Sequence, residues 1–386
     1  MIQYLVALGA GALIGAAYKS LTRKRNMHNC HAEILEYHDV YVTLSQSERN
    51  KMKDRRNANR NRINKSLDDG APKPIGFQTQ GSYSMQTMVL DPGNDYDIDD
   101  GIYFNKEDLI GSRGAELTPR HVKQIICDAA QDSSFKRAPE IRANCIRVYY
   151  NDGSHVDIPV YRKYVEEDIW GNEEEFFEIA GAEWKRSDPK SVTKWFNDHN
   201  LNQSPDLVNG RQMRRIVRLM KKFARSRCSW KTRIASGFVI TALIVECYKM
   251  TAERDDKALY DTMKAIYDRL VFDLEVDHPI LDEKLTKSAD DAKTKFLREK
   301  LKETLEKLDE LHDSNCDDAT AFEAWGRMFN SSFFFDKAKD ARDAEKAKLD
   351  AAIASKSENA RQRHATYAAA GLAMAAADYK PWATAG

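Results

Sequence analysis

The chain has 386 residues, enough for two packed domains, because single hydrophobic cores rarely grow beyond about 250 residues. Lysine and arginine total 60, as do aspartate and glutamate, so the zero net charge excludes an overall attraction to nucleic acid or anionic lipid. The six cysteines have neither CxxC nor zinc-ligand spacing, which fits the reducing cytosol. We therefore expect any charged site to be local, and we expect no direct nucleic-acid binding.

Residues 1–25 are predicted to form a hydrophobic anchor with a basic flank. Ile2–Tyr18 carries no formal charge, and a helix of that length spans about 25 Å of a membrane core. Basic residues follow this apolar run, so the positive-inside rule keeps the rest of the chain in the cytoplasm. A buried or partner-binding helix is the alternative interpretation.

The remaining chain divides into two lobes and a tail. Residues 26–183 open with a helical pattern over 29–67, whose basic run KMKDRRNANRNRINK is typical of a solvated helix face, and then turn to short strands. Residues 184–335 have almost wholly helical periodicity. Residues 336–386 predict a charged helix that ends in a flexible, Ala-rich tail.

Paired carboxylates open one predicted strand, DYDIDDGIYF. Alternate side chains of a strand share a face, so Asp97 and Asp99 point the same way while Ile98 points into the core. Two close carboxylates repel each other unless cations neutralise them, and Mg²⁺ prefers such oxygen ligands together with phosphate oxygens. We predict a divalent metal site at Asp97 and Asp99, with Asp95 and Asp100 as surface or capping residues.

A third carboxylate comes from the segment CIRVYYNDGSHVDIPVYR, which predicts a hairpin that turns at Asp152 and Gly153. Alternation in HVDIPVY puts His155 and Asp157 on one face, so Asp157 joins the other two aspartates if the hairpin packs beside their strand. Three carboxylates and two metal ions are the apparatus of in-line phosphoryl transfer. His155 is expected to be a neighbour of this site and not a participant.

Gly81 and Ser82 precede the aspartates and complete a nucleotide site. Glycine allows the backbone to approach a phosphate closely, and a serine hydroxyl with neighbouring N–H groups can hold its oxygens. Together with the carboxylates, this turn indicates a nucleoside triphosphate substrate.

These motifs, GFQTQGSYSMQTM, YDIDDGIYF and HVDIPVYR, resemble those of polymerase-β-type nucleotidyltransferases. More specifically, they are similar to the bacterial CD-NTases of the cGAS/DncV-like type, in the branch that makes cyclic GMP-AMP. The segment LSQSERNKMKDRRNANRNRI resembles the long N-terminal spine helix of that branch, and EWKRSDPKSVTKWF resembles its junction between lobes. MRRIVRLMKKF and the following SGF resemble the helical lobe shared with oligoadenylate synthetases. The resemblance covers about His28 to Phe335.

The resemblance implies an α+β fold with a polymerase-β-type nucleotidyltransferase core, a mixed β-sheet, the spine helix and an oligoadenylate-synthetase-like helical lobe. It implies that Gly81 and Ser82 bind the triphosphate. It further implies a lysine on the RRxxRxxK helix and a serine at the start of the next helix as triphosphate contacts, which are Lys221 and Ser236 here. The lysine is a point charge suited to phosphate. The serine lies at the start of a helix, which is an anion-binding position.

The metal ligands implied by the resemblance are Asp97, Asp99 and Asp157. They hold two Mg²⁺ ions, with Mn²⁺ as the alternative.

The function so implied is synthesis of a cyclic oligonucleotide second messenger, a cyclic dinucleotide such as cyclic GMP-AMP, from NTPs, with ATP and GTP expected. The resemblance places it in anti-phage (CBASS-type) signalling through a downstream effector, here at the cytoplasmic side of the bacterial inner membrane. In some such systems a ubiquitin-like ligation attaches the synthase C-terminus to partners, and the tail DYKPWATAG is compatible with that.

Two alternatives remain open at this point. One is a template-independent nucleotidyltransferase that makes linear oligonucleotides, and the other is a catalytically silent membrane scaffold. The intact aspartates argue against the scaffold, because a silent site has no reason to keep a repulsive cluster. The bases and the linkage of the product are not fixed by the sequence.

Overall fold

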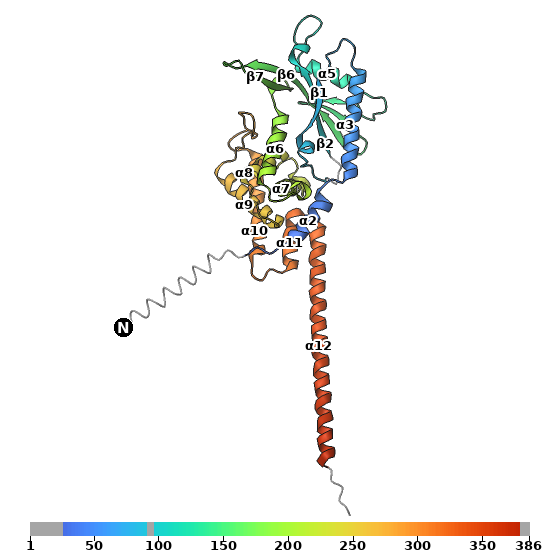
Figure 1. The fold of residues 1–386 in the computed structure, drawn as a ribbon, viewed down its shortest axis with the longest axis vertical. Coiled ribbons are helices and arrows are strands. Elements are labelled where there is room, and N and C mark those ends of the chain that lie inside the picture. The colour runs from blue at the N-terminus through green and yellow to red at the C-terminus, as the bar shows by residue number, and fades with distance from the viewer. Residues whose placement is uncertain (1–25, 91–95, 379–386) are drawn as a thin grey trace, which may run out of the picture.

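The computed structural model describes residues 26–90 and 96–378, with side chains up to residue 370. Figure 1 shows a lobe built on a β-sheet, a lobe of helices below it, and one long helix that extends away from both. The predicted anchor, Ile2–Tyr18, lies outside the described residues. Within them, no helix combines the length and the apolar character needed to cross a membrane.

The sheet lobe contains a mixed sheet in the order β3-β4-β5-β2-β6-β7-β8, with β1 also paired to β2. Its strands are β1 (Gly76–Gln80), β2 (Asp97–Asn105), β3 (Glu140–Ile141), β4 (Ile146–Tyr149), β5 (His155–Ile158), β6 (Val160–Glu167), β7 (Glu173–Ala180) and β8 (Trp184–Arg186). Its helices are α3 (Gln46–Ser66), the single turn α4 (Gly81–Ser84) and α5 (Pro119–Ala129).

Strand β2 is the centre of this lobe. It runs antiparallel to β1 and parallel to both β5 and β6. The predicted hairpin is confirmed, because β4 and β5 are antiparallel and Gly153 in their connection has a φ of 92°. A positive φ is a conformation that glycine adopts without steric cost. The hairpin brings β5 directly beside β2.

The helical stretch predicted over residues 29–67 is interrupted in the structure. It consists of α2 (His31–Tyr37), a short π-helix (His38–Val42) and α3. The break occurs because Ser45 is extended and caps α3: its hydroxyl accepts from the Glu48 N–H, and the Glu48 carboxylate accepts from the Ser45 N–H. This reciprocal capping box starts a new helix.

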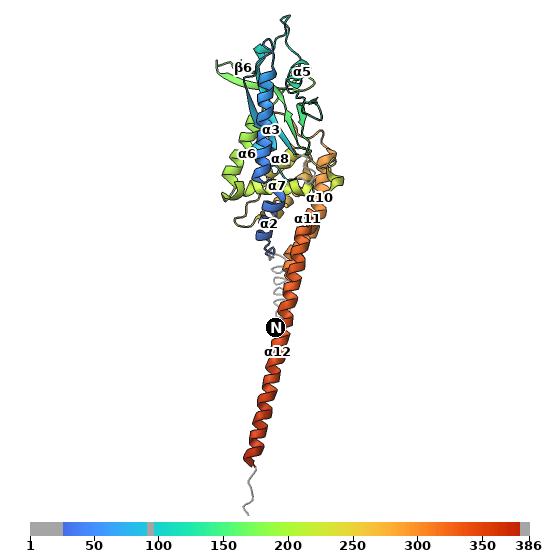
Figure 2. The same ribbon diagram turned by 90° about the vertical axis from the view of Figure 1, so that its right-hand side faces the viewer.

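Helices α3 and α5 cover one face of the sheet (Figure 2). Met52 and Ile63 of α3 and Ile126 of α5 share one buried cluster with Ile98 and other inward residues of the strands. Burying side chains of this size contributes about 1.5–3 kcal/mol each. Because Ile98 faces this core, its neighbours in the sequence point to the opposite face of the sheet.

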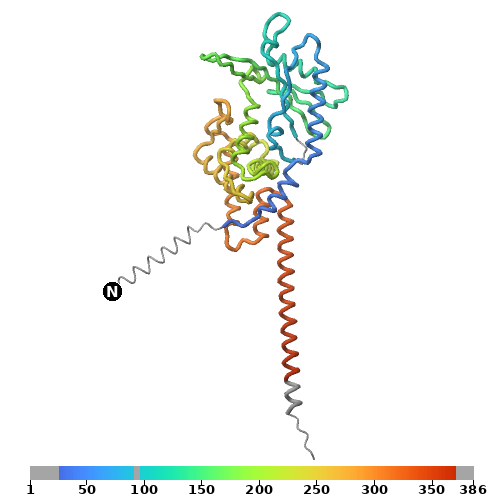
Figure 3. The backbone as a smooth tube through the Cα atoms, viewed as in Figure 1, coloured from blue at the N-terminus to red at the C-terminus, as the bar shows by residue number. Residues whose placement is uncertain are grey.

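The helical lobe contains α6 (Pro189–Gln203), α7 (Gln212–Ala224), α8 (Gly237–Cys247), α9 (Asp255–Phe272), α10 (Ala292–Leu308) and α11 (Asp318–Phe329). The chain trace in Figure 3 shows the start of the described chain lying against the later helices of this lobe. The His28 N–H donates to the Leu311 carbonyl at 2.8 Å, and the Tyr37 ring packs 4.7 Å from the Phe329 ring. Helix α2 is therefore part of the helical core.

Helix α12 (Ser332–Asp378) has 47 residues, and its first turn is anchored by the buried Phe333 and Phe334. Every residue from 342 to 370 is exposed. At 1.5 Å per residue the helix is about 70 Å long, so most of it stands clear of the body (Figure 1).

Candidate active site

Two neighbouring parallel strands position the carboxylates. The register of β2 and β5 pairs Asp97 with His155 and Asp99 with Asp157. Paired residues of adjacent strands project from the same face, so all four side chains lie on the face opposite the Ile98 core. The strand register thus brings Asp157 beside Asp97 and Asp99, as the sequence predicted.

The electrostatics of this face call for cations. Burial, reinforced by the charges of Asp97 and Asp157, raises the pKa of Asp99 well above its usual range. One cation is built in: Nε and Nη2 of Arg147 donate to the two oxygens of Asp157, each at 2.7 Å. One guanidinium against three carboxylates leaves negative charge that a divalent ion can neutralise.

The donor atoms also have the spacing of a metal site. A carboxylate oxygen of Asp97, a ring nitrogen of His155 and a carboxylate oxygen of Asp157 all lie within 4.8 Å of one another. His155 and Asp157 are buried, and Asp97 is partly exposed. The residues present therefore fit a divalent metal ion.

Gly81 follows β1 and sits against Asp99, because the register of β1 and β2 pairs Gln80 with Asp99. Gly81 has a φ of 66°, and a Cβ there would stand 2.2 Å from Oδ2 of Asp99. Only glycine satisfies both the backbone and the space. Ser82, the next residue, lines the same cavity as Asp97 and Asp99.

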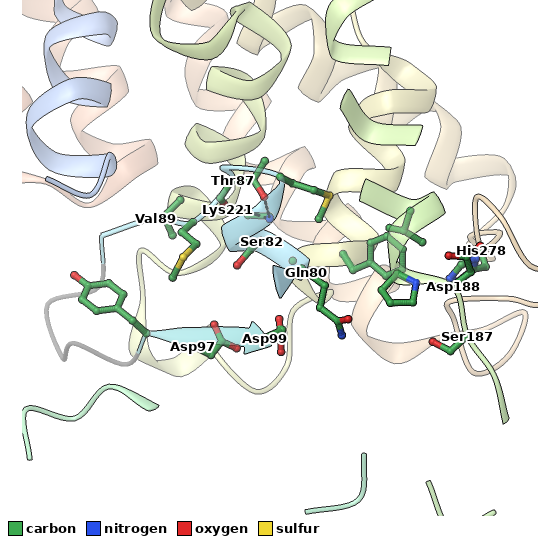
Figure 4. Close-up of a pocket in the computed structure, with 18 of the residues that line it drawn as sticks. Gln80, Ser82, Thr87, Val89, Asp97, Asp99, Ser187, Asp188, Lys221 and His278 are labelled. Carbon is green, nitrogen blue, oxygen red and sulfur yellow. Dashed lines mark hydrogen bonds between the residues drawn. The ribbon is translucent and has the colours of Figure 1, made fainter. Parts of the chain in front are cut away.

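Lys221 reaches the cavity from α7, in the other lobe. It is buried, and its Nζ donates to the Thr87 hydroxyl at 2.9 Å, as the dashed line in Figure 4 shows. Burial, with Arg225 nearby, lowers the pKa of Lys221 to about 7. An anionic ligand in the cavity would favour the charged form of this lysine and raise its pKa again.

The cavity has a volume of about 400 Å³ and lies between the two lobes. Figure 4 shows Ser82, Asp97, Asp99 and Lys221 around it. The wider lining comes from β1, α4, β2, the start of α6, α7, α8 and the loop after α9. It includes Gln80, Met85, Asp188, Val192, Arg225, Phe238 and His278. The cavity combines charged groups with apolar walls. A nucleotide has the matching parts, because its phosphates are charged and its base has apolar faces.

Ser236 is the one of the four predicted phosphate contacts that does not line this cavity. It caps α8, and its hydroxyl accepts from the Val239 N–H at 3.3 Å. The two residues after it, Gly237 and Phe238, line the cavity. A Cβ on Gly237 would lie 3.3 Å from Cε of Lys221, so the start of α8 packs against that lysine.

Asp100 corrects the prediction of a surface or capping residue. It is buried on the core side of β2, and its Oδ2 accepts from Nε of Arg60 at 2.6 Å. Its Oδ1 accepts from the Thr79 hydroxyl at 3.1 Å. A buried carboxylate needs such partners, and here they fasten α3 to the strand that carries Asp99. Asp95 lies outside the described residues.

Sequence reasoning missed Arg147 and Thr87. The signal for Arg147 was available, because a hairpin centred on Asp152 places residues 147 and 157 opposite each other. No local signal pointed to Thr87, which meets Lys221 only through the tertiary fold.

Comparison with known proteins agrees with this geometry. Residues 75–161 match the family model described as cyclic GMP-AMP synthase DncV-like, nucleotidyltransferase domain. The cyclic GMP-AMP synthase of Vibrio cholerae is 26% identical over 235 residues, which are 49% of this chain and 51% of that protein. The chain thus matches about half the length of this curated relative.

Solved structures show the same fold. A Vibrio cholerae di-nucleotide cyclase (DncV) structure in complex with ATP, GTP and 5MTHFGLU2 has a TM-score of 0.62 at 17% identity, over 79% of this chain and 96% of that one. A second, with the linear intermediate pppA(3′,5′)pG, has a TM-score of 0.61 at 17% identity and the same coverage. Escherichia coli DncV in its 3′-deoxy GTP bound form has a TM-score of 0.58 at 16% identity, over 76% and 93%.

These matches confirm three predictions. They confirm the resemblance to the cGAS/DncV-type nucleotidyltransferases, the α+β polymerase-β-type fold, and a nucleotidyltransferase domain match over residues 75–161. The lobe boundaries and the roles of the individual site residues remain predictions.

Proposed function

We propose that this chain, a nucleotidyltransferase of the cGAS/DncV type, joins nucleoside triphosphates into a cyclic oligonucleotide, with a cyclic dinucleotide such as cyclic GMP-AMP as the product. One observation carries the proposal: a single cavity between the lobes is lined by Gly81, Ser82, Asp97, Asp99 and Lys221. The structures of DncV with ATP, GTP and a linear dinucleotide support the choice of substrates.

The residues of the cavity divide the work by their chemistry. Ser82 and the backbone at Gly81 hold phosphate oxygens, and Lys221 neutralises their charge. Asp97, Asp99 and Asp157 would hold two divalent ions, Mg²⁺ or Mn²⁺. Such ions, when bound, supply Lewis-acid chemistry, which favours the deprotonated attacking hydroxyl and neutralises the leaving pyrophosphate.

The reaction consists of two transfers. In the first, a ribose hydroxyl of one triphosphate forms a bond to the α-phosphorus of another, the bond to pyrophosphate breaks, and the hydroxyl proton passes to solvent. In the second, the linear product turns around, and its free hydroxyl closes the ring with loss of a second pyrophosphate. The Arg147 guanidinium fixes the orientation of Asp157 for both steps.

The biological role follows the resemblance. We propose that the cyclic product is a second messenger in anti-phage (CBASS-type) defence and acts through a downstream effector. We also propose that Ile2–Tyr18 attaches the enzyme to the cytoplasmic side of the bacterial inner membrane, on the strength of its composition.

A labelled-nucleotide assay tests the activity. The full-length protein is incubated with four α-³²P-labelled NTPs and Mg²⁺ or Mn²⁺, treated with phosphatase and chromatographed beside an Asp97→Asn/Asp99→Asn control. A phosphatase-resistant product absent from the control supports cyclisation, and omission of single NTPs identifies the bases. A product whose 5′-triphosphate stays sensitive to phosphatase identifies a linear synthase. Absence of any product from the wild-type protein contradicts the proposal.

A further inference from the structure

His155 was expected only to neighbour the site, yet its place in the sheet makes it a member. It is the register partner of Asp97, just as Asp157 is the register partner of Asp99. The four side chains therefore form a two-by-two array on one face of two hydrogen-bonded strands. The imidazole occupies the corner of that array beside Asp97.

The distances within this array suit one metal ion. The donor atoms of the Asp97–His155–Asp157 cluster lie within 4.8 Å of one another. Ligands at about 2.0–2.2 Å from an ion stand up to about 4.4 Å apart when they lie on opposite sides of it. Small side-chain rotations would bring the donor atoms from within 4.8 Å to within about 4.4 Å of one another.

Charge also favours an imidazole in this position. The face already holds three carboxylates against the one guanidinium of Arg147. An imidazole nitrogen adds a ligand without adding another negative charge. Arg147 engages both oxygens of Asp157, so a nitrogen donor supplements a carboxylate whose lone pairs are already shared.

We propose that His155 supplies a nitrogen ligand to a divalent metal ion held by Asp97 and Asp157, and that this mixed nitrogen and oxygen set favours Mn²⁺ over Mg²⁺. The inference rests on the proposed metal-dependent function of the same site. Its chemical basis is relative: Mg²⁺ demands a strict octahedron of oxygen donors, whereas Mn²⁺, a first-row transition metal that also prefers oxygen, tolerates an imidazole among its oxygen ligands better than Mg²⁺ does. A metal ion held by the carboxylates of Asp97 and Asp99 alone would not be selected for Mn²⁺ over Mg²⁺.

The test uses bound Mn²⁺ as a probe and requires no turnover. Full-length protein is loaded with substoichiometric Mn²⁺, and electron spin-echo modulation is recorded for unlabelled protein and for protein labelled with ¹⁵N only in histidine. We expect ¹⁴N modulation in the unlabelled sample and its replacement by ¹⁵N modulation in the labelled one. Histidine labelling separates an imidazole ligand from backbone nitrogen, and this comparison needs no variant.

Two variants then assign the residue. His155→Gln should lose the nitrogen modulation and bind Mn²⁺ about tenfold more weakly in an EPR titration, with a smaller loss of Mg²⁺ affinity. His364→Gln is the matched control, because His364 is exposed on α12, far along the helix from the body. It should leave both the spectrum and the affinities unchanged, and circular dichroism checks that each variant is folded.

The outcomes separate the two proposals. Bound Mn²⁺ without histidine nitrogen modulation, or with modulation that survives in His155→Gln, overturns the role of His155 and leaves the nucleotidyltransferase function standing. No Mn²⁺ binding at millimolar concentration overturns both the nitrogen ligand and the metal-dependent function.

Discussion

Replacing Gly81 with alanine tests how closely the turn after β1 packs against the carboxylate of Asp99. The new methyl group would stand 2.2 Å from Oδ2 of Asp99. Non-bonded carbon and oxygen atoms rarely approach closer than about 3 Å, so either the turn or the carboxylate must move by about 1 Å. A displacement of that size at a reacting centre costs about 10²-fold in rate.

The same substitution also strains the backbone, and this effect must be separated from the contact with Asp99. Gly81 has a φ of 66°, and alanine in that left-handed region costs about 1–2 kcal/mol of folding free energy. Gly114 provides the matched control, because its φ is 79° and a Cβ there meets nothing within 4 Å. Gly114→Ala should therefore reproduce the strain without the clash.

The assay combines initial rates of product formation, measured by chromatography, with urea unfolding followed by circular dichroism. We expect both variants to lose about 1–2 kcal/mol of unfolding free energy, and only Gly81→Ala to lose about 10²-fold in kcat/KM. A Gly81→Ala enzyme with the rate of Gly114→Ala would refute the reasoning, since the clash with Asp99 would then have no catalytic effect.

Three other substitutions probe separate parts of the structure. Lys221→Met should lower kcat/KM. The stability that it gains over wild type should be about 3 kcal/mol larger at pH 6.5 than at pH 9.5. The sign follows because folding lowers the pKa of Lys221 to about 7. Burying this charge destabilises the wild type at low pH, and the lost stability returns as the pH rises from 7 toward 10. Urea titrations of both proteins at the two pH values measure the difference in unfolding free energy. Arg147→Gln should reduce kcat/KM about tenfold by freeing Asp157, yet tighten Mn²⁺ binding because one competing cation is gone; a parallel loss of metal affinity would count against that account. Arg60→Met should cost about 3 kcal/mol of unfolding free energy, because Asp100 is left buried without its ionic partner, and an unchanged urea midpoint would show that the pair is dispensable.

The sequence predicted the parts of the site that local rules determine. Asp97 and Asp99 share a face through strand alternation, and Asp157 joins them because the turn at Asp152 and Gly153 forms a hairpin. The proximity of Lys221 came only from the family resemblance, since no periodicity links a helix of one lobe to a turn of the other.

The features that sequence reasoning missed depend on long-range pairing. The depth of Asp100 could not be read locally, because a run of polar residues looks solvent-exposed until Arg60, forty positions away, is brought beside it. The break before α3 is different: the pattern of Ser45 and Glu48 was present as a capping box but lay inside a longer helical periodicity.

The exposed length of α12 gives the molecule two kinds of thermal behaviour. Each lobe is built around a buried hydrophobic cluster, so each should lose its structure in a cooperative transition. From residue 343 to 370 the helix is solvent-exposed at every position, so its stability depends on alanine content, charged pairs and its own backbone hydrogen bonds. Such a segment frays progressively from its C-terminal turns on heating. Helical signal will therefore fall along a slope well before the body unfolds, and a single melting temperature describes only the lobes.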